Sequence, residues 1–144
     1  MFSLLKDASW TVVENAAVAG TTDLTTDTVD MQGFDSIMYI VKLGDVTSGS
    51  VITLTAYSNP TDSASAGTTE KAASSITAGA SDYDNKLILL DVHRPSQRYM
   101  YAVLVIDTQN AVVDSIFAVR YNAKSVPITQ GSTVGQGTLG GPNA

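Results

Sequence analysis

The clearest pattern in this sequence is an alternation of apolar and polar residues with a period of two, which is typical of β-strands. Residues 51–57 place Ile52, Leu54 and Ala56 on one face and threonines on the other. Residues 112–121 also alternate, and the strand predicted there has one apolar face and one face that is only partly polar. The apolar face is formed by Val113, Phe117, Val119 and Tyr121, whereas the other face carries Asp114, Ile116, Ala118 and Arg120.

Two runs are apolar at nearly every position. Residues 87–92 and 99–106 are therefore predicted to be central strands that are covered on both faces. Strands are also predicted at residues 37–43 and 10–13, whereas residues 24–31 are a weaker candidate. A helix over residues 9–19 is disfavoured because β-branched residues and a glycine interrupt it.

Polar and glycine-rich segments separate these strands. Residues 44–49 are predicted to connect a hairpin, and residues 108–110 to join the last two strands. Residues 58–84 are rich in Ser, Thr, Ala, Gly and Asp, which predicts a long excursion with an edge strand near residues 71–77.

About seven or eight short strands without alternating helices predict an all-β fold, an antiparallel β-sandwich of jelly-roll-like type. The long excursion favours a jelly roll, because these sandwiches need a long connection between sheets. The expected organisation is a single domain. Residues 1–128 form the sandwich with an N-terminal arm, and residues 129–144 form a flexible tail rich in Gly, Ser and Thr.

Composition narrows the possible functions. The 144 residues include no cysteine, which excludes disulfides, zinc–thiolate sites and thiol nucleophiles. Eight Lys and Arg against 14 Asp and Glu give a net charge of -6, which argues against nucleic acid as a partner. The longest apolar run, residues 100–106, is too short to span a bilayer, so no membrane partner is expected.

Residues that could carry chemistry are few. His93 is the single histidine, and it is interpreted as a polar residue that closes a strand. Asp82, Asp84 and Asn85 resemble the start of a calcium loop, but the required Gly and Glu are missing. Residues 131–138 lack the Lys of a phosphate-binding loop. We therefore expect no catalytic residue, no metal and no cofactor.

The corner between the two apolar runs leaves two interpretations open. Arg94 or Arg98 pairs with Asp91 and fixes the corner, or the two guanidinium groups are exposed and meet an acidic partner surface. The N-terminal residues Phe2, Leu4 and Leu5 raise a similar question. They form either a first strand that packs on the sandwich or an arm that packs on a neighbour.

Several short motifs resemble the cement, or decoration, proteins on the capsids of tailed bacteriophages. The resemblance spans roughly residues 10–127 and rests on Trp10, Gly33-Phe34-Asp35-Ser36, Thr53–Tyr57, Asp91–Pro95 with Arg98-Tyr99, and Ala118–Asn122. It implies a jelly roll that self-associates, as a homodimer or a trimer, and bridges subunits of the major capsid protein. The protein would be made in the host cytoplasm and would lie on the outer surface of the virion.

The residues expected to contact partners lie near both ends of the chain and at the corner. They are Phe2, Leu4, Leu5, Arg94, Arg98, Val126, Pro127 and Ile128. The alternative function is a tail-associated or adhesin-like module that binds surface carbohydrate. Trp10 and most tyrosines fall in or beside strands, which counts against that alternative.

Overall fold

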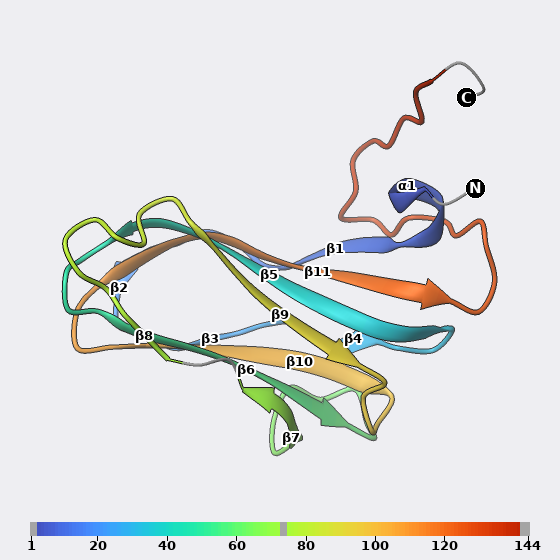
Figure 1. Cartoon of the computed structure of the whole chain (residues 1–144). Coiled ribbons are helices and arrows are strands. Elements are labelled where there is room, and N and C mark those ends of the chain that lie inside the picture. The colour runs from blue at the N-terminus through green and yellow to red at the C-terminus, as the bar shows by residue number, and fades with distance from the viewer. Residues whose placement is uncertain (1–2, 73–74, 142–144) are drawn as a thin grey trace.

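The chain forms two antiparallel β-sheets that pack face to face (Figure 1). The computed structural model describes residues 3–72 and 75–141. Sheet A contains β1 (Ser9–Glu14), β2 (Ala17–Gly20), β5 (Phe34–Val46), β9 (Leu87–His93) and β11 (Ala111–Ala123). Sheet B contains β3 (Leu24–Thr25), β4 (Val29–Asp30), β6 (Val51–Asn59), β7 (Thr68–Ala72), β8 (Ile76–Thr77) and β10 (Tyr99–Asp107). The predicted antiparallel β-sandwich is confirmed.

The strands pair in a nested order. β1 and β2 both pair with β11, β3 and β4 with β10, β5 with β9, and β6 with β7 and β8. The first strands thus pair with the last, and the pairing proceeds inward to the middle of the chain. Lateral pairing of β5 with β11 and of β6 with β10 completes the two sheets. This order is that of a jelly roll.

Strand β1 is preceded by a short helix, α1 (Leu4–Asp7). Residues 9–19, the disfavoured helical window, contain β1 and most of β2, and the weaker candidate at residues 24–31 contains β3 and β4. The edge strand predicted near residues 71–77 is present as β7 and β8. The described residues contain no helix that is long and apolar enough to cross a membrane.

The hairpin predicted around residues 44–49 is wrong, because β5 lies in sheet A and β6 in sheet B. Strand β5 already has β11 on one side and β9 on the other, so it has no free edge for β6. The connection crosses between the sheets, where Thr47 N donates to Asn110 O and Gly49 N donates to Ala78 O. Neighbouring loops thus satisfy these amides in place of a second strand.

Strand β9 was predicted to be central, but it is an edge strand of sheet A (Figure 1). Leu90 and Val92 face the core, whereas Leu87 and Leu89 lie on the outer face and are 55% and 56% exposed. Burial on both faces therefore does not explain the uninterrupted apolar run at residues 87–92. Strand β10, by contrast, lies between β6 and the β3 and β4 pieces, so its central position is confirmed.

The core between the sheets is built from alternate residues of the long strands. Its largest fully buried side chains include Tyr39, Ile37, Leu43, Ile52, Leu54, Met100, Leu104 and Ile116. In β11 the alternation changes phase, because the register with β5 shifts between Val113 and Ser115. Val113, Ile116 and Ala118 consequently face the core, whereas Phe117, Val119 and Tyr121 face outward. The prediction that put Val113 on the same side as Phe117 is wrong.

We expect Leu54→Ala to lower the free energy of unfolding by about 2–5 kcal/mol, because Leu54 is fully buried and its truncation leaves a cavity. Urea unfolding of the two proteins measures this difference. Val105→Ala is the matched control, since Val105 lies on the neighbouring β10 but is 36% exposed. Its cost should be about 1 kcal/mol or less. Equal costs for both variants would contradict this assignment of the core.

Candidate partner interface

The N-terminal and C-terminal segments of the chain pack together outside the sandwich, beyond sheet A (Figure 1). We define residues 3–7 and 125–134 as the terminal lobe. Within it, Ile128 N donates to Lys6 O at 2.8 Å. The structure thus brings the predicted contact residues Leu4 and Leu5 close to the predicted segment 126–128. Phe2, which was predicted with them, lies outside the described residues.

The side chain of Gln130 fixes the lobe to the sandwich. Its Nε2 donates to Leu5 O and Ala8 O, each at 2.7 Å, and its Oε1 accepts from Trp10 N at 3.0 Å. Thr133 Oγ1 also accepts from Val12 N at 3.2 Å. Sequence reasoning missed Gln130, because its partners lie 120 to 125 positions away in the chain.

Apolar side chains on the outer face of sheet A lie under the lobe. Ala8, Ile40 and Val119 are buried there, and four partly buried side chains, Trp10, Met38, Phe117 and Tyr121, pack against them. The Trp10 and Phe117 rings are 6.3 Å apart, and Trp10 Nε1 donates to Leu4 O at 3.2 Å. Trp10 is therefore a half-buried residue of β1 that packs between Phe117 and the lobe.

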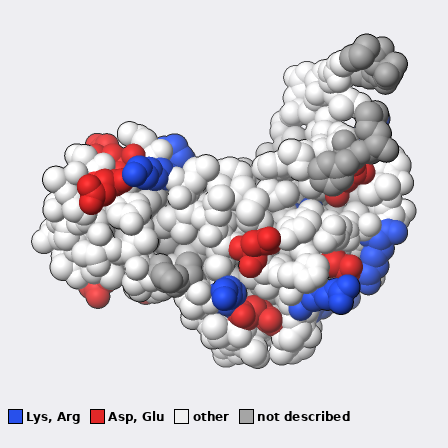
Figure 2. Space-filling model, viewed as in Figure 1, with Lys and Arg blue, Asp and Glu red and all other residues white. Residues whose placement is uncertain are grey.

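The outside of the lobe is largely uncharged on the face shown in Figure 2. Leu4 and Val126 are 56% and 55% exposed, so each keeps more than half of its apolar side chain in solvent. Leu5 and Ile128 are half-buried, and Pro127 is exposed. The lobe thus presents an apolar surface built from two distant parts of the chain.

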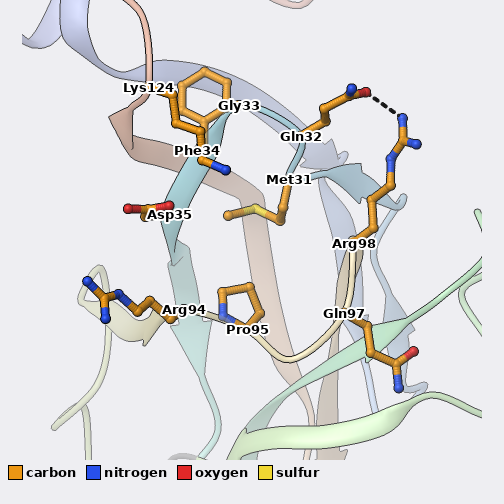
Figure 3. A pocket seen from close by; sticks show the side chains of 10 residues that line it. All are labelled: Met31, Gln32, Gly33, Phe34, Asp35, Arg94, Pro95, Gln97, Arg98 and Lys124. Carbon is orange, nitrogen blue, oxygen red and sulfur yellow. Dashed lines mark hydrogen bonds between the residues drawn. The ribbon is translucent and has the colours of Figure 1, made fainter.

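A basic pocket of about 410 Å³ lies at the end of the sandwich where β11 leaves sheet A (Figure 3). Three cations, Arg94, Arg98 and Lys124, and one carboxylate, Asp35, line it. The other lining residues are Met31, Gln32, Gly33, Phe34, Pro95 and Gln97. In a chain with net charge -6, this cavity is locally positive. Sequence reasoning found the two arginines but not Lys124, which folding brings to them.

The backbone around this pocket turns sharply. Gly33 has a φ of 88° in the turn before β5, where Phe34 N donates to Met31 O at 3.0 Å. Arg94 has a φ of 51°, and its amide donates to Asp35 O at 2.9 Å. These turns place the start of β5 beside the end of β9, which sets the positions of Asp35 and Arg94.

Arg98 is held by an ion pair. Its Nε and Nη2 donate to the two carboxylate oxygens of Asp30 at 2.9 and 2.8 Å, and Nη2 also donates to Gln32 Oε1 at 2.7 Å. The hydrogen bonds from Arg98 hold the pKa of Asp30 below its usual range. The predicted pairing with Asp91 is wrong. Arg98 is next to Tyr99, which lies opposite Asp30 in sheet B, so its side chain is close to Asp30.

Asp91 has a different partner, since Tyr121 OH donates to both of its carboxylate oxygens at 2.6 and 2.8 Å. Arg94 is exposed and forms no ion pair within the part of the chain that the structure describes. Of the two guanidinium groups predicted to meet an acidic partner, Arg94 is therefore the one without an internal carboxylate.

Beneath the pocket, Arg120 links the two sheets. Its Nη1 donates to Asp30 O of β4 at 2.6 Å, and its Nη2 donates to Ser9 Oγ of β1 at 2.8 Å. The guanidinium also lies 4.5 Å from the centre of the Phe34 ring. Burial lowers the pKa of Arg120. This residue supports the pocket from inside rather than offering a charge to a partner.

His93 closes β9, as predicted. Its Nδ1 lies 2.6 Å from Ser36 Oγ, and the two residues are cross-strand neighbours. Ser36 is fully buried, so its hydroxyl is not accessible to a substrate. The carboxylate nearest in sequence, Asp91, is occupied by Tyr121. The pair therefore has the geometry of a strand-end hydrogen bond.

The aspartates that resemble a calcium loop serve as backbone caps. Asp82 accepts from Gly79 N at 3.0 Å, and Asp84 accepts from Val46 N at 2.8 Å. Across residues 3–72 and 75–141, no group of three or more His, Asp or Glu side chains is arranged to hold a metal ion. The candidate surfaces of this chain are thus the terminal lobe and the basic pocket.

No family model and no curated protein matches this chain. Among solved structures, it is similar to the VP2 subviral particle of infectious bursal disease virus, with a TM-score of 0.44 and 12% identity over 79% of this chain and 32% of that one. It is also similar to a chain in the structure of the Gt strain of that virus, with a TM-score of 0.41 and 14% identity over 81% of this chain and 31% of that one. The chain thus spans about a third of these proteins. At such TM-scores, these likenesses assign neither a family nor a function.

We expect Gln130→Ala to destabilise the protein by about 1–3 kcal/mol, because three hydrogen bonds to the backbone are lost. The amide of Trp10 should also exchange faster with solvent. Urea unfolding and amide exchange measure the two effects. Gln136→Ala is the control, since the side chain of Gln136 bonds only Thr138 within the described residues. Equal behaviour of the two variants would show that Gln130 does not fix the lobe.

Arg98→Gln should raise the pKa of Asp30 towards its ordinary value, because the variant removes the charge that stabilises the carboxylate. In the native protein, the stabilisation from this pair is present above the unfolded-state pKa of Asp30. It is lost as the pH falls through the lower folded-state pKa. An NMR titration of the Asp30 carboxyl group measures the shift. Arg94→Gln should leave this pKa unchanged, and an equal shift in both variants would contradict the assigned ion pair.

Proposed function

We propose that this protein is a virion structural protein, a capsid cement protein of a tailed bacteriophage. It binds the outer surface of the shell and bridges neighbouring major capsid subunits. The motifs that resemble cement proteins support the proposal, and so does the jelly-roll fold with its two candidate contact surfaces. The observation that carries it is the terminal lobe, in which two segments predicted separately as contacts lie together and expose Leu4 and Val126.

The lobe suits contact with a second protein because the apolar residues Leu4, Val126 and Pro127 are exposed on it. Burial of a Leu or Val side chain contributes about 1.5–3 kcal/mol. The lobe also lies beyond sheet A (Figure 1), so the lobe and the sandwich can rest on different subunits. A bridge between subunits requires two such surfaces that do not overlap.

The basic pocket is the second surface. Arg94 and Lys124 lie at its rim, and Arg94 has no carboxylate partner among the described residues. Although the whole chain is acidic, the cations of this pocket suit it to acidic side chains on a coat subunit. The charges would orient the protein on the shell, while the lobe would supply most of the affinity.

The proposal also includes self-association, as a homodimer or a trimer, and synthesis in the host cytoplasm before the protein binds to the shell. Such a protein reinforces the shell against internal pressure by linking subunits, and this task needs no cofactor. The carbohydrate-binding alternative has no support from Trp10, which packs under the lobe.

The test adds purified protein to phage capsids assembled without it, followed by sedimentation and a count of bound copies. We expect saturation at a number fixed by the capsid lattice. Leu4→Ser with Val126→Ser should weaken binding about tenfold or more, because two exposed apolar side chains are lost from the contact. Arg94→Glu with Lys124→Glu should also weaken binding, more strongly at low salt than at high salt.

Two controls make this test specific. Val105→Ser removes an apolar side chain that is 36% exposed on sheet B, and Lys86→Glu reverses an exposed charge outside the basic pocket. Both variants should bind like the native protein. Absence of binding to any capsid would overturn the proposal, and equal effects of all variants would overturn the assigned contact surfaces.

A further inference from the structure

Three of the four sheet edges in this sandwich carry features that prevent pairing with another strand. One edge of sheet A consists of β1, which the C-terminal segment covers because Gln130 and Thr133 accept from Trp10 N and Val12 N, and of β2, which has only four residues. In sheet B, one edge is broken into β3 and β4, and the other into β7 and β8. Of these pieces, β7 has five residues and the others two each. Covered or very short edges are common means of blocking strand addition.

The fourth edge, β9, has none of these features. It runs for seven residues, and its register with β5 has no shift. It contains neither proline nor lysine, and its one carboxylate, Asp91, accepts from Tyr121. A long, regular and apolar edge strand pairs readily with a further strand.

Hydrogen bonding to β5 determines which groups of β9 point away from the sheet. Arg94 N donates to Asp35 O, and Leu43 N donates to Lys86 O, each at 2.9 Å. Opposite residues in an antiparallel pair alternate between bonded and non-bonded pairs. The even-numbered residues of β9 therefore bond to β5. The backbone groups of residues 87, 89, 91 and 93 point outward, and none of them has a backbone partner among the described residues.

The side chains of the same residues lie on the outer face of sheet A. Leu87 and Leu89 are more than half exposed there. Leu89 pairs with Ile40, Ile40 with Phe117, and Phe117 with Val12, so one apolar row crosses the whole sheet. The lobe lies beside Val12, at the β1 end of this row, and Leu89 is left at the other end. Free backbone groups and exposed apolar side chains thus coincide on one strand.

We infer that β9 is a dimer interface, at which β9 of a second copy of this chain adds antiparallel across a two-fold axis. The inference refines the self-association included in the proposed function and rests on that part alone. A second copy fits because a two-fold axis perpendicular to the sheet pairs the two edge strands antiparallel. In the second copy, the backbone groups of the same odd-numbered residues point outward. Each free amide of one β9 can therefore bond to a free carbonyl of the other. Sheet A then continues through the dimer.

The phase of the outward groups restricts the register, because only odd-numbered residues can form the hydrogen-bonded pairs. Leu89 opposite Leu89 of the second copy satisfies this rule and sets Leu87 opposite Asp91. This register joins the two apolar rows at the axis. It also keeps the two copies of Asp91 apart, whereas a register with Asp91 opposite itself would place like charges together.

The test measures the mass of the free protein by sedimentation equilibrium over a range of concentrations. We expect a dimer that Leu87→Lys with Leu89→Lys weakens at least about tenfold, a change of about 1.4 kcal/mol. Val105→Lys is the control for each single variant, Leu87→Lys and Leu89→Lys, since it adds one lysine at an exposed valine of sheet B. Circular dichroism verifies that each variant is folded.

A second measurement uses the absence of cysteine from the chain. A Leu89→Cys variant treated with a short bismaleimide should give a covalent dimer, whereas Val105→Cys should not. A native protein that stays monomeric, a dimer that the lysines leave intact, or a failure of Leu89→Cys to cross-link would each overturn the inference. These experiments use the free protein, so their result is independent of whether capsids are bound.

Discussion

The fold depends on β11, a central strand whose two faces are both apolar. On one face Val113, Ile116 and Ala118 pack against sheet B, and on the other Phe117, Val119 and Tyr121 would be in water if nothing covered them. The two terminal segments supply that cover, and Gln130 holds them in place. The lobe is therefore part of how sheet A is stabilised. Because it covers only the β1 side of this face, the leucines of β9 remain in solvent.

Local alternation was enough to predict the strands and the sandwich, because the side-chain period of a strand is a property of the backbone. It was not enough to assign faces. A shift of register at Val113 reverses the face of every later residue in β11, and nothing in the residues themselves marks it. The apolar run at residues 87–92 has the composition of a buried strand, although half of its side chains lie on an open face. Composition shows that these side chains are apolar, but it does not show whether another part of the chain packs against them.

The candidate contact surfaces were predictable only in part, because they are formed by segments that are far apart in the sequence. Leu4, Leu5 and residues 126–128 stand out because they are apolar residues near polar ends of the chain. Their proximity in space, however, follows from the pairing of the first strand with the last. The partner of Arg98 is Asp30, far away in sequence, rather than the nearby Asp91. Lys124 joins the arginines for the same reason, since a jelly roll brings its distant segments to a common end.

The nested order of the strands also determines when this molecule can fold during its synthesis. Strand β11 lies at the centre of sheet A yet follows every strand with which it pairs, and β10 stands in the same relation to sheet B. Until both have been made, β1 to β4 lack the strands with which they pair, and β5 has only β9 beside it. Contacts so distant in sequence form slowly, and the unpaired strands are prone to aggregation meanwhile. Newly made chains should therefore depend on protection by chaperones until translation has passed residue 123.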